Sequence, residues 1–139
     1  MIDRILVPMD DSEMAQKALR YALEAYQDAD ITVLHVVGKM SPMMGEIVGL
    51  ALEEDFQTAA EERADDIFTT AREIAAEYNA EIDTTVAIGH PARTIVKKSE
   101  AFDTVVLGSH SGSIADRLFV GNVAEDVFRR APVPVTVVR

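Results

Sequence analysis

A stretch rich in glycine and hydroxyl side chains is the part of the sequence best suited to binding an anion. It consists of Gly108, Ser109, His110, Ser111, Gly112 and Ser113, directly after the apolar run 104–107. Glycines let backbone N–H groups approach an anion closely, and hydroxyl groups add further donors. Gly121 then opens a helical pattern whose first N–H groups would favour phosphate, and Arg117 between the two could supply a cation. The composition predicts a phosphate site, although a plain surface loop rich in glycine and serine would have the same residues.

Three known motifs do not describe this chain. No Gly-Lys-Ser/Thr follows Gly108, so the stretch is not a Walker A loop, and the dinucleotide fingerprint belongs after the first strand. The pair Asp10-Asp11 resembles the acidic pair of a response-regulator receiver. That fold needs an acid at the end of its third strand and a lysine after its fifth, and both are missing from this sequence. The receiver hypothesis is therefore rejected.

The histidines and serines offer little support for metal binding or hydrolysis. His35, His90 and His110 do not share the spacing of helical metal ligands, although each lies at or near a predicted strand end. No serine lies in a nucleophile-elbow sequence, so a serine hydrolase is not indicated. The chain has no cysteine, which excludes disulfides, thiolate metal sites and cysteine nucleophiles.

Short apolar runs alternate with longer helical patterns, and these elements must position the candidate residues. The runs 5–8, 31–37, 82–88, 104–107 and 135–138 predict five buried strands. Helical patterns begin near Asp10-Asp11-Ser12, at Phe56 (ending at Asn79), at Pro91 and at about Gly121. This alternation predicts a doubly wound α/β fold, a parallel sheet with helices on both faces. We expect a single domain over residues 1–139, with ligands at the carboxyl ends of the strands.

One segment shows no clear pattern. Residues 38–52 contain Pro42, three glycines and the methionines Met40, Met43 and Met44. Neither a strand nor a helix is predicted there, and no role follows from the residue types.

Composition and charge exclude several classes of partner. The 139 residues are 48% hydrophobic and 27% charged, with a net charge of −11. Nucleic acids and anionic membranes are poor partners for such a chain, because both require basic surfaces. No run of about 18 apolar residues and no signal-peptide pattern occurs, so we expect a cytoplasmic protein. The chain has nine Arg and four Lys against 24 acidic residues, a composition that suits a halophilic source. High salt would screen the repulsion among the acidic side chains. The alternative is an ordinary acidic cytoplasmic protein.

The chain resembles the universal stress protein (UspA-like) family over its whole length. The segments that carry the resemblance are 5–10 with Ser12, 34–36, 89–91 with Ile95, 106–110, 120–124 and 132–135. The resemblance implies a five-stranded parallel sheet with strand order 3-2-1-4-5.

The ATP-binding branch of that family has a motif that this chain matches in part. The motif is Gly, two residues, Gly, nine residues, Gly, and then Ser or Thr. Counted from Gly108, the third glycine falls on Gly121, but the second falls on Ser111 and the final hydroxyl residue on Asn122. Gly112 lies one position late, and a Cβ at position 111 could crowd a phosphate. Asn122 keeps an amide donor and caps helices well.

The resemblance also implies which residues would line a nucleotide pocket. Pro8, Met9 and Asp10 would line the adenine and ribose side, Val36 would contact the base, Leu107 to Ser113 would wrap ribose and phosphates, and Gly121, Asn122 and Val123 would hold the phosphates. A Mg²⁺ ion could bridge Asp10 and a triphosphate. Alternatively, Pro8 and Val36 pack at strand ends and Asp10 caps a helix.

The function implied by the resemblance is binding of ATP or a related adenine nucleotide in a stress response. Hydrolysis would be slow or absent, and no catalytic residue is predicted. The alternative is a dimeric stress module that binds no nucleotide and acts through its surface. The sequence feature that distinguishes these hypotheses is the stretch from Gly108 to Asn122, which departs from the ATP-binding motif at Ser111 and Asn122.

The last predicted strand favours a homodimer. Val135 to Val138 should lie at a sheet edge, where unpaired backbone groups invite pairing with another chain. Pro132 and Pro134 would block pairing at the start of the strand. Antiparallel pairing of the strand with its own copy satisfies two-fold symmetry, and the resemblance implies the same interface.

Overall fold

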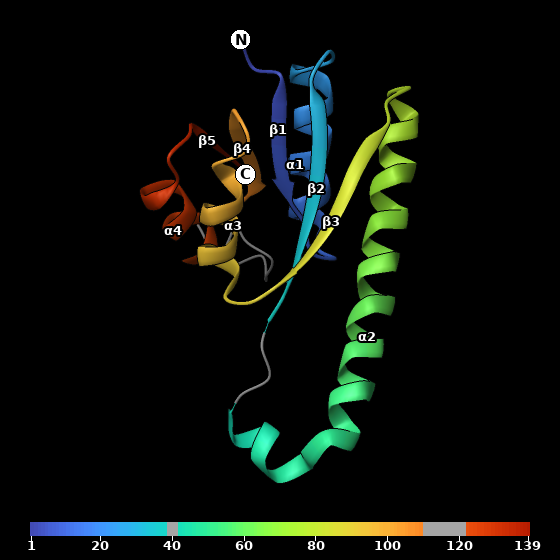
Figure 1. Cartoon of the computed structure of the whole chain (residues 1–139). Helices are drawn as coiled ribbons and strands as arrows, with labels where there is room; N and C mark the ends of the chain where they lie inside the picture. Colours follow the sequence, from blue (N-terminus) through green and yellow to red (C-terminus); the bar gives the residue numbers. More distant parts are fainter. Residues whose placement is uncertain (39–41, 110–121) are drawn as a thin grey trace.

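The computed structural model describes residues 1–38, 42–109 and 122–139, and the side chains of 42–57 are not among the parts described. Five parallel strands alternate with four described helices (Figure 1). The strands are β1 (Arg4–Pro8), β2 (Asp30–Val37), β3 (Ile82–Ile88), β4 (Thr104–Gly108) and β5 (Val135–Val138). The helices are α1 (Glu13–Ala25), α2 (Pro42–Glu77), α3 (Pro91–Ser99) and α4 (Asn122–Arg130).

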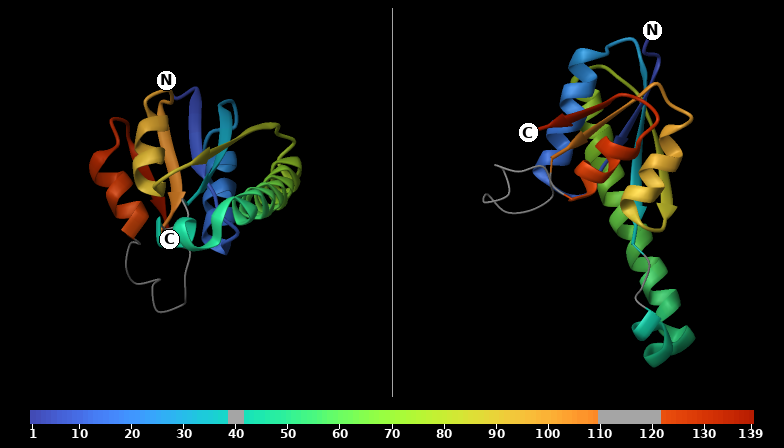
Figure 2. Two further views of the ribbon diagram at one scale, coloured as in Figure 1. Left: turned by 60° about the horizontal axis from the view of Figure 1, so that its bottom comes forward. Right: turned by 90° about the vertical axis from the view of Figure 1, so that its left-hand side faces the viewer.

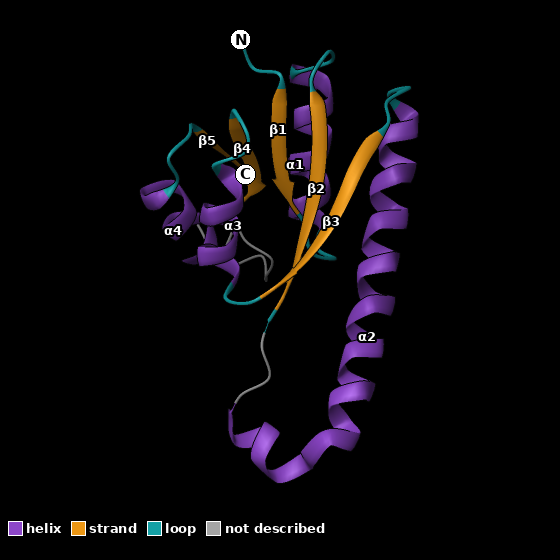
Figure 3. Ribbon diagram, in the orientation of Figure 1, coloured by secondary structure: helices purple, strands orange, loops and turns teal. Residues whose placement is uncertain are grey.

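The sheet order is β3-β2-β1-β4-β5, which confirms the predicted topology. β1 lies at the centre, where Ile5 is in register with Ile31 of β2 and with Thr104 of β4. The sheet is therefore doubly wound, and the carboxyl ends of its parallel strands lie at the same edge (Figure 3).

Alternating side chains of the central strands fill two cores, one on each face of the sheet. Ile5 and Val7 pack with α1 and α2, whereas Leu6 packs with α3 and α4. Because Ile5, Leu6 and Val7 are covered on both faces of the sheet, this part of β1 is apolar without alternation. β3 differs, because it is an edge strand on which Val86 and Ile88 remain 46% and 64% exposed.

Local sequence explains where the helices begin and end. Ser12 caps α1, with its Oγ accepting the N–H of Ala15 at 3.1 Å. Asn79 adopts a positive φ of 55° just beyond α2, which confirms the predicted stop. Pro91 opens α3 after the cap residue His90, as its missing N–H allows.

α2 is much longer than the sequence predicts. The spacing of apolar residues predicts a helix from Phe56, but α2 begins at Pro42 and has 36 residues. Its first part extends past the carboxyl ends of the strands, as two views show (Figures 1 and 2). Apolar periodicity marks a helix only where one side faces a core, and this part of α2 runs beyond the sheet. The sequence pattern makes no prediction for residues 42–52, and the structure shows that they belong to α2.

A carboxylate ties the start of β1 to the start of β4. Asp103 Oδ2 accepts the backbone N–H groups of Asp3 and Arg4, each at 2.9 Å. These two bonds lower the pKa of Asp103, because they favour the ionised carboxylate. The Arg4 guanidinium also lies 5.1 Å from the ring centre of Phe102. The N-terminal strand is thus fixed to a turn far away in the sequence.

Candidate functional site

The candidate site lies at the carboxyl edge of the sheet, between β1 and β4. β1 has β2, the next strand along the chain, on one side and β4 on its other side. Strand order reverses at this point, and α1, the helix after β1, and α4, the helix after β4, pack on opposite faces of the sheet. Ligands of open α/β sheets bind in the crevice that such a reversal creates.

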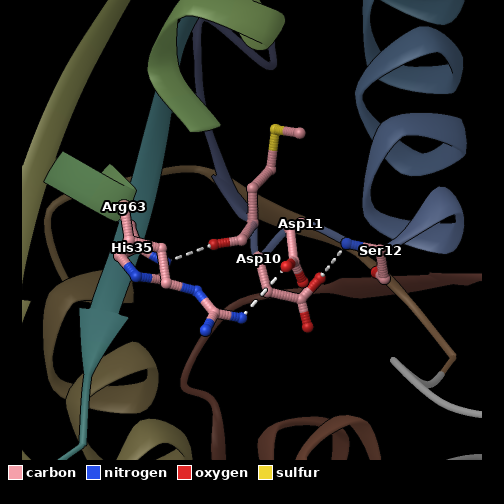
Figure 4. Close-up of polar contacts among 6 residues, drawn as sticks. Asp10, Asp11, Ser12, His35 and Arg63 are labelled. Atoms are coloured by element: carbon pink, nitrogen blue, oxygen red, sulfur yellow. Dashed lines mark hydrogen bonds and ion pairs between the residues drawn. The ribbon is translucent and has the colours of Figure 1, made fainter. Parts of the chain in front are cut away.

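The turn after β1 is held by a series of hydrogen bonds (Figure 4). The Met9 N–H donates to the Leu34 carbonyl at 2.8 Å, and His35 Nδ1 lies 2.9 Å from the Met9 carbonyl oxygen. One residue on, Asp10 Oδ1 accepts the N–H of Ser12 at 2.9 Å. Asp10 therefore orders the residue that caps α1 and is not the cap itself.

Not all predicted pocket residues point to the same side of the sheet. The Met9 side chain is buried in the core beneath α1 and α2. Val36 and Leu107 pack against the opposite core, beside α3 and α4, and Pro8 is half-buried at the end of β1. The structure thus brings Val36 and Leu107 to one face, while Met9 can contribute to that face through its backbone alone.

Gly108 has a packing role that the sequence did not reveal. A Cβ at this position would lie 2.8 Å from the backbone C and O atoms of Met14 in α1. That is shorter than any comfortable contact, so glycine is required for β4 to pack against α1. The glycine was predicted to admit a ligand, but its nearest described neighbour is protein backbone.

Ser109 is the unusual polar residue of the edge. Its backbone N–H donates to the Val138 carbonyl at 2.8 Å. Its hydroxyl Oγ is buried and has no hydrogen-bond partner, the one such side-chain atom in the described parts of the chain. Buried polar groups are nearly always paired, so an orphaned hydroxyl at a strand end is a natural contact point for a ligand.

The remaining predicted residues fall in two groups. Asn122 and Val123 are exposed at the start of α4. His110, Ser111, Gly112, Ser113 and Gly121 lie outside the described residues, as does Arg117.

A depression beside the β1–α1 turn was not predicted. It has a cavity volume of about 180 Å³ and is lined by Met9, Asp10, Asp11, Gln16, Arg63, Asp66, Ile67 and Thr70. Arg63 of α2 pairs with Asp11 at 3.1 Å, with both side chains largely exposed. Such an exposed pair contributes little stability. Nothing in the local sequence of α2 indicates that Arg63 reaches this turn, because only the fold brings them together.

The described residues give no support to a metal centre. Across residues 1–38, 58–109 and 122–139, no three histidines or carboxylates lie close enough to hold a metal ion. His35 is buried against the Met9 carbonyl and His90 caps α3, so each has a structural contact. In those same ranges, no helix is long and apolar enough to cross a membrane.

Comparison with known proteins identifies the relatives of the chain. A family model described as the universal stress protein family matches residues 1–139. A universal stress protein of Methanocaldococcus jannaschii is 29% identical over 143 residues, covering 98% of this chain and 81% of that protein. The solved structure of universal stress protein UspA from Lactobacillus plantarum is 28% identical, with a TM-score of 0.80 over 99% of this chain and 98% of that one.

Three more distant structures contain adenine nucleotides. A universal stress protein in complex with cAMP is 22% identical, with a TM-score of 0.71 over 99% of this chain and 97% of that one. The Archaeoglobus fulgidus protein with dAMP is 19% identical, with a TM-score of 0.69 over 100% and 98%. An Arabidopsis thaliana family member with AMP bound is 17% identical, with a TM-score of 0.69 over 98% and 90%. These likenesses establish the shared fold, and the nucleotides belong to those three proteins.

Proposed function

The chain belongs to the universal stress protein family, and we propose that it binds ATP or a related adenine nucleotide at the carboxyl edge of its sheet. The observation that carries the proposal is the buried, unpaired hydroxyl of Ser109, the first residue after β4 at the carboxyl edge of the sheet. A bound ribose or phosphate would supply the missing hydrogen-bond partner. The complexes of distant relatives with AMP, cAMP and dAMP support an adenine nucleotide as the ligand.

In this proposal the site lies on the face beneath α3 and α4. Val36, Leu107 and the Pro8 end of β1 offer an apolar surface for the base, and Ser109 offers a donor for the sugar or phosphate. His110, Ser111, Gly112, Ser113, Gly121, Asn122 and Val123 would complete the phosphate side. A Mg²⁺ ion would take one carboxylate ligand at most, from Asp10, and water for the rest.

The role proposed is binding within a stress response, with hydrolysis slow or absent. We place this role in one domain over residues 1–139 and in the cytoplasm. The net charge of −11 disfavours nucleic acid and anionic membrane as partners.

The direct test is whether the purified protein carries a nucleotide. Protein is denatured, and the supernatant is analysed by ultraviolet absorbance and mass spectrometry. Calorimetry with AMP, cAMP and ATP, each with and without Mg²⁺, then measures the affinity of the emptied protein. Absence of a bound nucleotide together with no heat from any of the three would favour the alternative of a dimeric module that acts through its surface.

Restoring the family motif should strengthen ATP binding. In the double variant Ser111→Gly and Asn122→Ser, the phosphate side regains a second glycine and a hydroxyl. We expect the dissociation constant for ATP to fall by about tenfold, equivalent to ~1.4 kcal/mol. Calorimetry on both proteins measures this, with AMP as the control ligand because it lacks the outer phosphates. Equal ATP affinity would show that the two departures are neutral.

We also propose a homodimer formed through β5. Pro134 and Val138 direct their carbonyls to β4, so the intervening Val135 and Val137 direct their backbone N–H and C=O groups to the open edge. Those groups can pair with a second copy related by two-fold symmetry.

A charge at the centre of that edge should break the dimer. In Val137→Asp, two carboxylates would meet near the symmetry axis, so light scattering should give the mass of one chain. Val137→Ala is the control, because it trims the same half-buried side chain without adding charge and should remain dimeric. Circular dichroism checks that both variants fold. A wild-type mass of one chain at micromolar concentration would contradict the proposed dimer.

The acidic composition leads to a proposal of adaptation to high salt. With a net charge of −11, self-repulsion opposes folding at low ionic strength, and added salt screens it. We expect the thermal midpoint to rise from low salt to molar potassium chloride. Differential scanning calorimetry measures the midpoint, with an uncharged osmolyte as the control. A flat or falling midpoint in salt would contradict the halophilic assignment.

A further inference from the structure

The backbone of Met9 is held from β2 by two hydrogen bonds. Its N–H donates to the Leu34 carbonyl at 2.8 Å, which continues the strand ladder. Its own carbonyl oxygen lies 2.9 Å from Nδ1 of His35, the next residue of β2. Met9 is the first residue beyond β1, so this pair of bonds decides the direction in which the chain leaves the sheet.

The contact also fixes the tautomer of the neutral imidazole. A carbonyl oxygen can only accept, so Nδ1 must carry a proton and donate it to Met9. In the neutral ring the lone pair then lies on Nε2. Because His35 is 7% exposed and Met9 is 5% exposed, this hydrogen bond is largely shielded from water. Without it, the Met9 carbonyl would keep little access to another donor.

The order imposed on Met9 passes directly to the next residues. Asp10 follows Met9 and holds the N–H of Ser12 at 2.9 Å, and Ser12 Oγ holds the N–H of Ala15 at 3.1 Å. Hydrogen bonds and the backbone between them therefore link His35 of β2, through the turn after β1, to the first turn of α1. Figure 4 shows the His35 and Asp10 bonds of this series. It includes Met9 and Asp10, which the family resemblance places on the adenine and ribose side of the pocket.

We propose that His35 is a positioning residue of the nucleotide site, which holds the Met9–Asp10 turn in its binding geometry through the Nδ1–H to Met9 carbonyl bond. This inference rests on the proposed function. His35 does not contact the ligand in this scheme. It acts through the Met9 backbone, and the position of Met9 in turn sets the direction of the Asp10 carboxylate.

Three substitutions separate positioning from packing. In His35→Asn, the side-chain amide nitrogen takes the place of Nδ1 and can still donate to Met9. In His35→Gln, the amide reaches the place of Nε2, and in His35→Leu no donor remains. We expect AMP affinity within about threefold of the wild type for Asn, and a loss of about tenfold or more for Gln and Leu. All three lose imidazole packing, so a purely structural role would weaken them alike.

Two measurements on the protein without nucleotide make the test independent of the proposed function. Nitrogen-15 spectra of the neutral ring should show the proton on Nδ1 and not on Nε2. Amide hydrogen exchange at Ser12 should speed up in the Leu and Gln variants and stay slow in Asn.

The outcomes are distinct. A ring protonated on Nε2 alone, or AMP affinity unchanged in the Leu variant, would overturn the positioning role even if nucleotide binds. A wild type that binds no adenine nucleotide would overturn the proposed function, whereas the ring and exchange spectra would still report whether His35 orders the turn.

Discussion

Gly108→Ala should lower the free energy of unfolding by about 2–3 kcal/mol, as overpacking of a tight contact does. The added Cβ would lie 2.8 Å from the backbone C and O atoms of Met14. A side chain could rotate away, but a helix backbone can move only with the rest of α1. β4 and α1 would have to separate, and both contribute to the core on that face of the sheet. Urea unfolding monitored by circular dichroism measures the change.

Gly38→Ala is the matched control for this substitution. A Cβ at Gly38 meets no atom within 4 Å, and this glycine does not have a positive φ. Alanine should therefore leave stability unchanged or raise it by about 0.4–1 kcal/mol, because the unfolded chain loses freedom. If Gly108→Ala proved as stable as Gly38→Ala but lost nucleotide affinity, ligand approach and not packing would explain this glycine.

Gly121→Val should abolish nucleotide binding while leaving the fold intact. The family motif places this glycine against the phosphates, and a branched side chain there would occupy their position. We expect a loss of about a hundredfold or more in AMP and ATP affinity by calorimetry, which corresponds to ~2.7 kcal/mol. Gly121→Ala should give an intermediate loss. The thermal midpoint, measured on the same samples, should change little.

The outcome that would contradict this prediction is specific. Unchanged affinity in Gly121→Val would remove the phosphate role assigned to the start of α4. A large drop in the thermal midpoint would instead indicate that position 121 serves the fold, as position 108 does.

Much of the fold could be predicted because its determinants are local. The apolar runs that became β1 and β4 are buried on both sides, and Ser12, Asn79 and Pro91 act within one turn of their own position. The start of α2 could not be predicted in this way. Its first residues have no strand beside them, and without a buried side there is no periodicity to detect.

The sequence predicts where in the fold the candidate site lies, but not which side chains contact one another there. Strand topology correctly brings the ends of β1 and β4 together. The sequence did not reveal that Met9 and Val36 face opposite cores, because their pairing register depends on the whole sheet. Nor did it reveal that His35 bonds to Met9 or that Arg63 reaches Asp11. Those contacts join residues 26 and 52 positions apart, so only the tertiary structure makes them visible.

The central position of β1 has a consequence for synthesis on the ribosome. One side of β1 can pair with β2 almost at once, but its other side must wait for β4, and the Asp3–Asp103 bond that joins the starts of these strands spans 100 positions. At ~5–20 residues per second, the nascent chain exposes that open edge for roughly 5–20 s. An unpaired apolar strand edge is the surface that holdase chaperones and aggregates both recognise. The β1 segment, made long before its partner β4, therefore needs protection while the polypeptide emerges.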